Sequence, residues 1–192
     1  LKSVKLGNGL VSIGSGWPYS NTYEIDNGAK SGAFGNCGNL ETVEFGPNLE
    51  TIGDHAFSEC IALKTLNLPD SVQTIGKNAF YHNTALASVS FGTGLTAIDE
   101  CAFYNCPKLQ TVEFREFDTP ILTIYKFAFA NAVKLTTLKF SESLKTINYG
   151  AFSGCAALET LTLPDSLTEI AGALSWVPQL PQPSLLASGM EQ

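Results

Sequence analysis

The sequence predicts a solenoid, in which about seven coils of 23 residues stack along one axis and pair their strands in a parallel ladder. Three observations lead to this prediction. An apolar pattern that opens with leucine recurs at a nearly constant spacing, each unit holds an extended segment followed by a turn, and one unit alone is too short to bury its apolar side. The composition agrees, because 44% hydrophobic residues with only 15% charged residues exclude a chain disordered throughout its length.

The repeat is visible in the leucines that open successive units. Their spacing is 23 residues over most of the chain and 26 where the fifth unit carries three extra residues. The first unit is longer still, because sixteen residues are inserted in it. The apolar residues inside the units recur at the same offsets, a regularity that chance does not produce. The opening leucines are Leu1, Leu40, Leu63, Leu86, Leu109, Leu135 and Leu158.

The local structure expected for each part of a unit follows from its residues, as the second unit illustrates. Val43 and Phe45 are two residues apart, a spacing that places both side chains on one face of a strand. The Gly-Pro dipeptide at 46–47 is typical of a turn. A second short apolar pair follows, and the Ala-Phe dipeptide at 56–57 suits a tight helical turn. Stacked units therefore give a continuous apolar core.

The repeating pattern L-x-x-[LV]-x-[LF]-x-x-x-[LV]-x-x-I-x-x-x-AF-x-x-C resembles the BspA-like (treponemal-type) leucine-rich repeat over residues 1–170. The Ile-x-x-x-Ala-Phe-x-x-Cys segment distinguishes this class from leucine-rich repeats that end in Asn. The resemblance implies a right-handed leucine-rich repeat solenoid, with a parallel β-sheet on the concave face and short helical or 3-10 turns on the convex face. It also implies a surface or secreted protein, chiefly bacterial, associated with adhesion to host or neighbouring-cell macromolecules.

The domain organisation follows from where the repeat is interrupted. Residues 1–170 are expected to form the solenoid, with insertions at about 14–31 in the first coil and about 115–120 in the fifth. Residues 171–192 carry Trp176 and three prolines, and we expect them to form a C-terminal cap and tail. The chain begins within the repeat, so we expect a fragment. No apolar run approaches the roughly 18 residues of a transmembrane segment.

The cysteines are expected to be structural. Four of them share one repeat position, which in other units holds Asn83 or Ala132, so a small buried side chain is required there. Their spacings are not those of zinc ligands. A disulfide between the first two, in adjacent coils, is the alternative. Cys101 occupies another position, nearer the surface. The four cysteines of the shared position are Cys37, Cys60, Cys106 and Cys155.

Neither catalysis nor nucleic-acid binding is indicated. The chain holds no nucleophile elbow, phosphate-binding glycine loop or metalloprotease motif, and its two histidines lie at different repeat positions. We therefore predict no enzyme activity, no cofactor and no metal. The net charge of −7 also argues against nucleic acid or an anionic membrane as a partner, because a protein that binds either of them through charge needs an excess of cationic side chains.

Two groups of residues are candidates for ligand binding. The first insertion carries Trp17, Tyr19 and Tyr23 among small polar residues, and aromatic rings in such loops supply contact area at low entropic cost. Their alternative role is to cover the open end of the first coil. The second group follows the second repeat leucine and points away from the core, alongside a Ser/Thr column that stabilises the sheet or adds to the same surface. This outward column comprises Lys5, Glu44, Asn67, Ser90, Glu113 and Lys139.

The sequence thus favours a non-enzymatic binding or adhesion module at the cell surface or outside the cell. We expect it to recognise a host or neighbouring-cell protein or glycan through its strand face and its aromatic loop. The alternative function is a structural spacer within a larger surface protein, with no ligand of its own.

Overall fold

The computed structural model describes residues 1–14, 32–115 and 122–172. Most of the first insertion, with Trp17, Tyr19 and Tyr23, lies outside these residues. So do nearly all of the second insertion and residues 173–192. The predictions made for those segments are therefore not addressed by the fold that follows.

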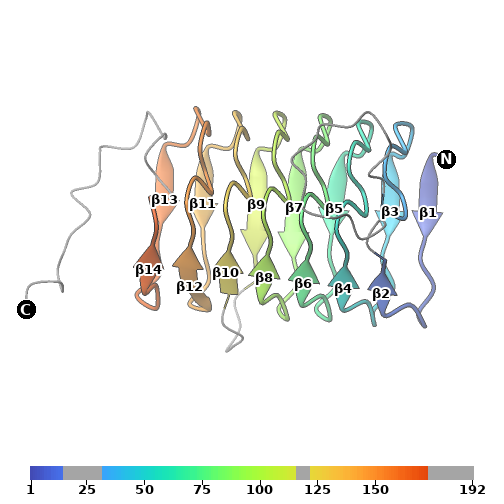
Figure 1. Cartoon of the computed structure of the whole chain (residues 1–192), viewed down its shortest axis with the longest axis horizontal. Helices are drawn as coiled ribbons and strands as arrows, with labels where there is room; N and C mark the ends of the chain where they lie inside the picture. The colour runs from blue at the N-terminus through green and yellow to red at the C-terminus, as the bar shows by residue number, and fades with distance from the viewer. Residues whose placement is uncertain (15–31, 116–121, 173–192) are drawn as a thin grey trace, which may run out of the picture.

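The described residues form two columns of short strands that run along the length of the molecule (Figure 1). Each coil contributes one odd-numbered and one even-numbered strand. The odd-numbered strands are β1 (Ser3–Lys5), β3 (Thr42–Glu44), β5 (Thr65–Asn67), β7 (Ser88–Phe91), β9 (Thr111–Phe114), β11 (Thr137–Lys139) and β13 (Thr160–Thr162). The even-numbered strands are β2 (Ser12–Ile13), β4 (Thr51–Ile52), β6 (Thr74–Ile75), β8 (Ala97–Ile98), β10 (Leu122–Ile124), β12 (Leu144–Ile147) and β14 (Glu169–Ile170).

All strand pairs in both columns are parallel, as predicted, and equivalent repeat positions pair with one another. Thr65 lies opposite Ser88, for example, and Ile52 lies opposite Ile75. The even-numbered strands form one seven-stranded sheet. The odd-numbered strands divide into a two-stranded sheet, β1–β3, and a five-stranded sheet, β5 to β13. The uninterrupted solenoid on this side therefore has about five turns, slightly fewer than the seven coils that the repeat predicts.

The core is a narrow apolar column between the two rows of strands. Its centre is a stack of six phenylalanine rings, one from the Ala-Phe segment of each of the first six coils. Neighbouring rings are 5.0 to 5.6 Å apart between centroids and at most 11° from parallel. The sequence-based expectation that these rings line up in a row is confirmed. The rings belong to Phe34, Phe57, Phe80, Phe103, Phe129 and Phe152.

The helical or 3-10 turns expected around Ala-Phe are absent from the described residues, and this part of the prediction was wrong. The segments are chains of hydrogen-bonded turns instead. The reason is a pair of left-handed residues in each of the second to sixth coils, two positions before and two positions after the phenylalanine. In the second coil these are His55 (φ 57°) and Glu59 (φ 58°). A residue with positive φ ends a right-handed helix, so no helix can pass through either position.

The cysteines are free, as predicted, and those at positions 60, 106 and 155 are buried. The prediction of burial was wrong for Cys37, which is half-buried in the first coil. Small size is only part of what their shared position requires. The Sγ atoms of Cys60 and Cys106 donate hydrogen bonds of 3.1 and 3.4 Å to the carbonyl oxygens of Phe34 and Phe80, one coil earlier. Asn83 Nδ2 donates in the same way to a phenylalanine carbonyl, at 3.0 Å. In the second, third, fourth and sixth coils the position therefore holds a side-chain donor that links successive coils, whereas Ala132 in the fifth coil fills it by size alone.

Burial makes these thiols unreactive and makes the stability of the fold depend on pH. It raises the pKa of Cys60, Cys106 and Cys155 to about 12, and that of Cys101 to about 11. Thiols of an unfolded chain ionise near pH 8.5. Above that pH the unfolded state loses protons that the folded state keeps, so the free energy of unfolding falls as pH rises from about 9 towards 12. Below about pH 8 this contribution is fully present.

We therefore expect at most two of the five thiols, Cys37 and Cys101, to react with an aromatic disulfide reagent at pH 8 in the folded protein. All five should react after denaturation. Denaturation curves recorded between pH 7 and 11 should show stability declining only above about pH 9. Rapid labelling of all five thiols without denaturant would contradict the buried placement.

Candidate functional site

The outward column predicted from the sequence lies on one face of the molecule. Its six residues occupy the last or next-to-last positions of the odd-numbered strands and alternate with buried or half-buried residues. Asn67 lies opposite Ser90, and Ser90 opposite Glu113. Ser90 is half-buried and the other five are exposed. The structure thus brings together Lys5, Glu44, Asn67, Ser90, Glu113 and Lys139, with the break between β3 and β5 separating the first two from the rest.

The Ser/Thr column shares this exposed face. Sequence reasoning left its orientation open, but in β3 both Thr42 and Glu44 are exposed while Val43 between them is not. The same alternation holds in β9, where Thr111 and Glu113 flank the buried Val112. Residues two apart in a strand lie on the same side. The strand face therefore carries two polar side chains per coil, twice as many as the outward column alone.

Charges on the strand face are paired at its N-terminal end. Lys5 Nζ lies 2.7 Å from Glu44 Oε1, across the β1–β3 ladder. Glu41 lies between Lys2 and Lys64, at 3.9 and 2.9 Å. The hydrogen bond from Lys64, together with the charges of both lysines, lowers the pKa of Glu41. The middle of the face, from β5 to β7, is uncharged.

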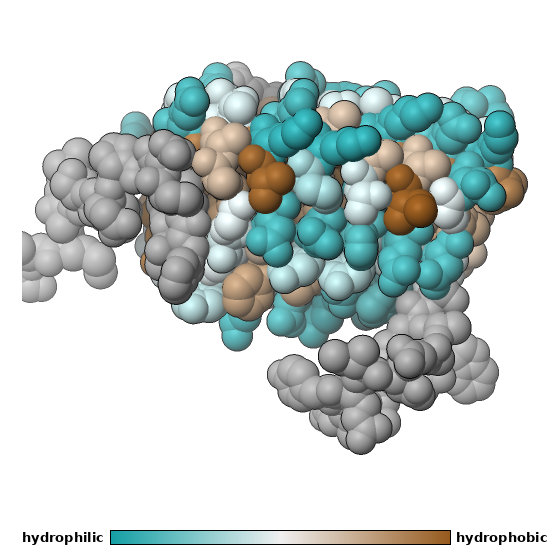
Figure 2. Space-filling model, turned by 90° about the horizontal axis from the view of Figure 1, so that it is seen from above, coloured by the Kyte–Doolittle hydropathy of each residue, from teal (hydrophilic) through white to brown (hydrophobic). Residues whose placement is uncertain are grey.

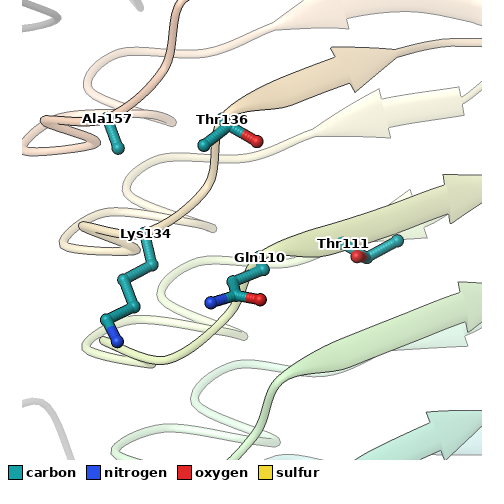
Figure 3. A pocket seen from close by; sticks show the side chains of 5 residues that line it. All are labelled: Gln110, Thr111, Lys134, Thr136 and Ala157. Atoms are coloured by element: carbon teal, nitrogen blue, oxygen red, sulfur yellow. The ribbon is translucent and has the colours of Figure 1, made fainter.

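A shallow groove of about 530 Å³ lies beside the start of β9 and β11 (Figure 3). It is lined by Gln110, Thr111, Lys134, Thr136 and Ala157, which lie next to or near the opening leucines of three successive coils. These residues are up to 47 positions apart in the sequence, so sequence reasoning did not group them.

The groove coincides with a weakened strand pairing. β7 and β9 pair through four residues each, whereas β9 and β11 pair only at Glu113 and Lys139. The one pair that remains keeps equivalent repeat positions opposite each other, although the sequence between these two strands carries three extra residues. Between β5 and β13 the ladder of odd-numbered strands is thus most sparsely paired beside the groove.

Other chemistry is not indicated within the described residues. They hold no group of three or more metal-ligating side chains, and no helix that could span a membrane. The face seen in Figure 2 is mostly hydrophilic, with separate hydrophobic spots. Scattered residues such as Ile61 and Val133 are about half exposed, and isolated exposed apolar residues are normal for a soluble surface.

The repeat agrees with a known family over most of the chain. The model of the BspA type leucine rich repeat region matches residues 17–121 and 122–174, with six copies of the repeat. The chain belongs to the BspA type leucine-rich repeat family. Its two strand columns, stacked phenylalanines and buried cysteine position are therefore the form that the BspA type repeat takes in this protein.

Two solved structures of leucine-rich repeat proteins resemble this BspA type chain. The protein from Eubacterium ventriosum ATCC 27560 is 29% identical, with a TM-score of 0.70 over 79% of this chain and 41% of the other. The protein from Bacteroides ovatus ATCC 8483 is 28% identical, with a TM-score of 0.56 over 89% of this chain and 45% of the other. The chain thus spans less than half the length of either protein. No curated protein matches it significantly.

Proposed function

We propose that this BspA type chain is a non-enzymatic binding module, which attaches to a protein or glycan of a host or neighbouring cell. The proposal places residues 1–170 in the binding unit and residues 171–192 at its end, and it places the protein at the cell surface or outside the cell. The family resemblance supports this location. The strand face is proposed as the main contact surface, with Trp17, Tyr19 and Tyr23 of the first insertion as a second contact.

The observation that carries the proposal is the exposed polar strand face. Its side chains contribute nothing to the apolar core, yet the ladder holds them in rows on a rigid support. A preorganised surface loses little conformational entropy on binding, which is the main cost of association for flexible segments. Asn67 and Ser90 lie opposite each other on the strand face and are both uncharged, so a partner can approach there without first breaking an ion pair.

The test is binding to a panel of immobilised extracellular-matrix proteins and glycans. Replacing Asn67 and Ser90 together by arginine should block the centre of the strand face and weaken binding about tenfold or more. The matched control is Gln73→Arg, which adds the same side chain to an exposed position outside the strand face in the third coil. Asn67 and Gln73 are exposed, so each of those two substitutions should change the free energy of unfolding by less than about 0.5 kcal/mol. Ser90 is half-buried, so the unfolding temperature of the double variant is measured beside its binding.

A triple variant tests the loop, with Trp17, Tyr19 and Tyr23 changed to serine. Binding that survives both the strand-face variant and the loop variant would show that neither surface is the contact. If the intact chain binds no member of the panel, the proposal is wrong and the chain acts as a spacer.

A further inference from the structure

We propose that the groove beside β9 and β11 binds the carboxylate of an acidic polysaccharide, such as one built from uronic acids. This inference rests on the proposed binding function and gives it a ligand class and a location. It concerns the five residues that line the groove: Gln110, Thr111, Lys134, Thr136 and Ala157.

The groove offers the right hydrogen-bonding groups in a small space. Figure 3 shows the Lys134 side chain extending towards the coil that carries Gln110. The ammonium group of Lys134 donates to a carboxylate as a charge-assisted hydrogen bond. The Gln110 amide and the two threonine hydroxyls both donate and accept, so they match the hydroxyl groups of a sugar ring.

The electrostatic environment favours an anion despite the acidic composition of the chain. Lys134 and Lys108, which occupy the same repeat position in successive coils, are both exposed. Among the described residues, neither takes part in any of the ion pairs. Lys134 is the only charged residue among the five that line the groove. Glu113 lies opposite Lys139 farther along the strands.

The shape of the groove favours a polysaccharide over an acidic protein segment. Protein interfaces depend on large apolar or aromatic anchors that fill desolvated pockets. The lining of this groove offers no such pocket, because its only apolar member is the methyl group of Ala157. The groove is open and crosses three coils, so an extended, hydrated chain can lie along it without losing its remaining contacts with water.

Isothermal titration calorimetry with oligogalacturonate at low ionic strength tests the proposal. We expect the intact chain to bind it, with affinity falling as salt is added. Lys134→Gln should weaken binding about tenfold, because it removes the charge-assisted bond. The matched control is Lys126→Gln, which removes an exposed lysine outside the groove and should change affinity by less than about twofold. Methyl-esterified oligogalacturonate, which has the same backbone without the charge, should not bind.

Three results would overturn the inference. These are absence of binding by the intact chain, equal losses in the two lysine variants, and binding of polyglutamate as tight as that of oligogalacturonate, which would indicate an acidic protein partner. The proposed function is tested separately, by the binding of the strand-face variant to the panel of matrix proteins and glycans. If Lys134→Gln has no effect while the Asn67 and Ser90 variant abolishes binding to the panel, only the groove is wrong.

Discussion

Replacing Phe103 by alanine is expected to lower the free energy of unfolding by about 3–5 kcal/mol. The ring is completely buried in the centre of the stack, 5.1 Å from Phe80 and 5.2 Å from Phe129 between centroids. Phe91 packs against its edge at 5.7 Å. The coils on either side are held at the spacing of their backbone ladders, so they cannot collapse into the cavity that alanine leaves. Chemical denaturation followed by circular dichroism measures the loss.

Tyr104→Ala is the matched control for this variant. Tyr104 follows Phe103 in the sequence and also stacks on a ring of the preceding coil, Tyr81, at 5.6 Å and 5°. It is only half-buried, so its loss should cost about 1 kcal/mol. Similar costs for the two variants would show that the buried phenylalanine stack is not what holds the coils together.

Replacing Gly92 by alanine is expected to cost about 3 kcal/mol, the upper end of the range for overpacking. A Cβ atom at this position would lie 2.2 Å from the carbonyl oxygen of Pro69 and 2.6 Å from the Cα atom of Asp70. Both are backbone atoms of the preceding coil, so no side-chain rotation relieves the clash. The two turns would have to move apart, which strains the strand pairs on both sides. The decrease in thermal unfolding temperature measures this effect.

Gly7 provides the control, because it occupies the same repeat position in the first coil. A Cβ atom there meets no other atom within 4 Å. Gly7→Ala should therefore change stability by less than about 0.5 kcal/mol. If both variants lost equally little stability, close contact between successive turns would not explain why glycine stands at position 92.

The solenoid could be predicted because the sequence features that specify it are local and recur in every unit. The constant spacing from Leu40 to Leu63 to Leu86 requires equivalent positions to stack, whatever the details of each turn. The alternation around Val43 then decides which side chains face outwards. Strand direction, the stacked phenylalanines and the buried cysteines follow from the same period, and the structure agrees with each of them.

The conformation of the Ala-Phe segment was missed although a signal for it exists. Asn or Gly stands at many of the left-handed positions, as in Asn78, Asn105 and Gly150, and these residues tolerate positive φ best. Cys101 and Phe127 occupy positions equivalent to Asn78 and hide the pattern, because their side chains carry no such preference. There the hydrogen bonds between neighbouring coils impose the conformation, and local propensity does not.

The sequence by itself determined the winding of this protein, its core and the side of each strand that meets solvent, because these depend only on a period and on hydrophobicity. The tertiary structure alone decided where the odd-numbered ladder breaks and where the groove opens. Gln110, Lys134 and Ala157 line one groove although up to 47 positions separate them, and the strand pair beside them is joined only at Glu113 and Lys139. How many residues two strands pair through depends on all the contacts of two neighbouring coils at once, so no single repeat unit encodes it.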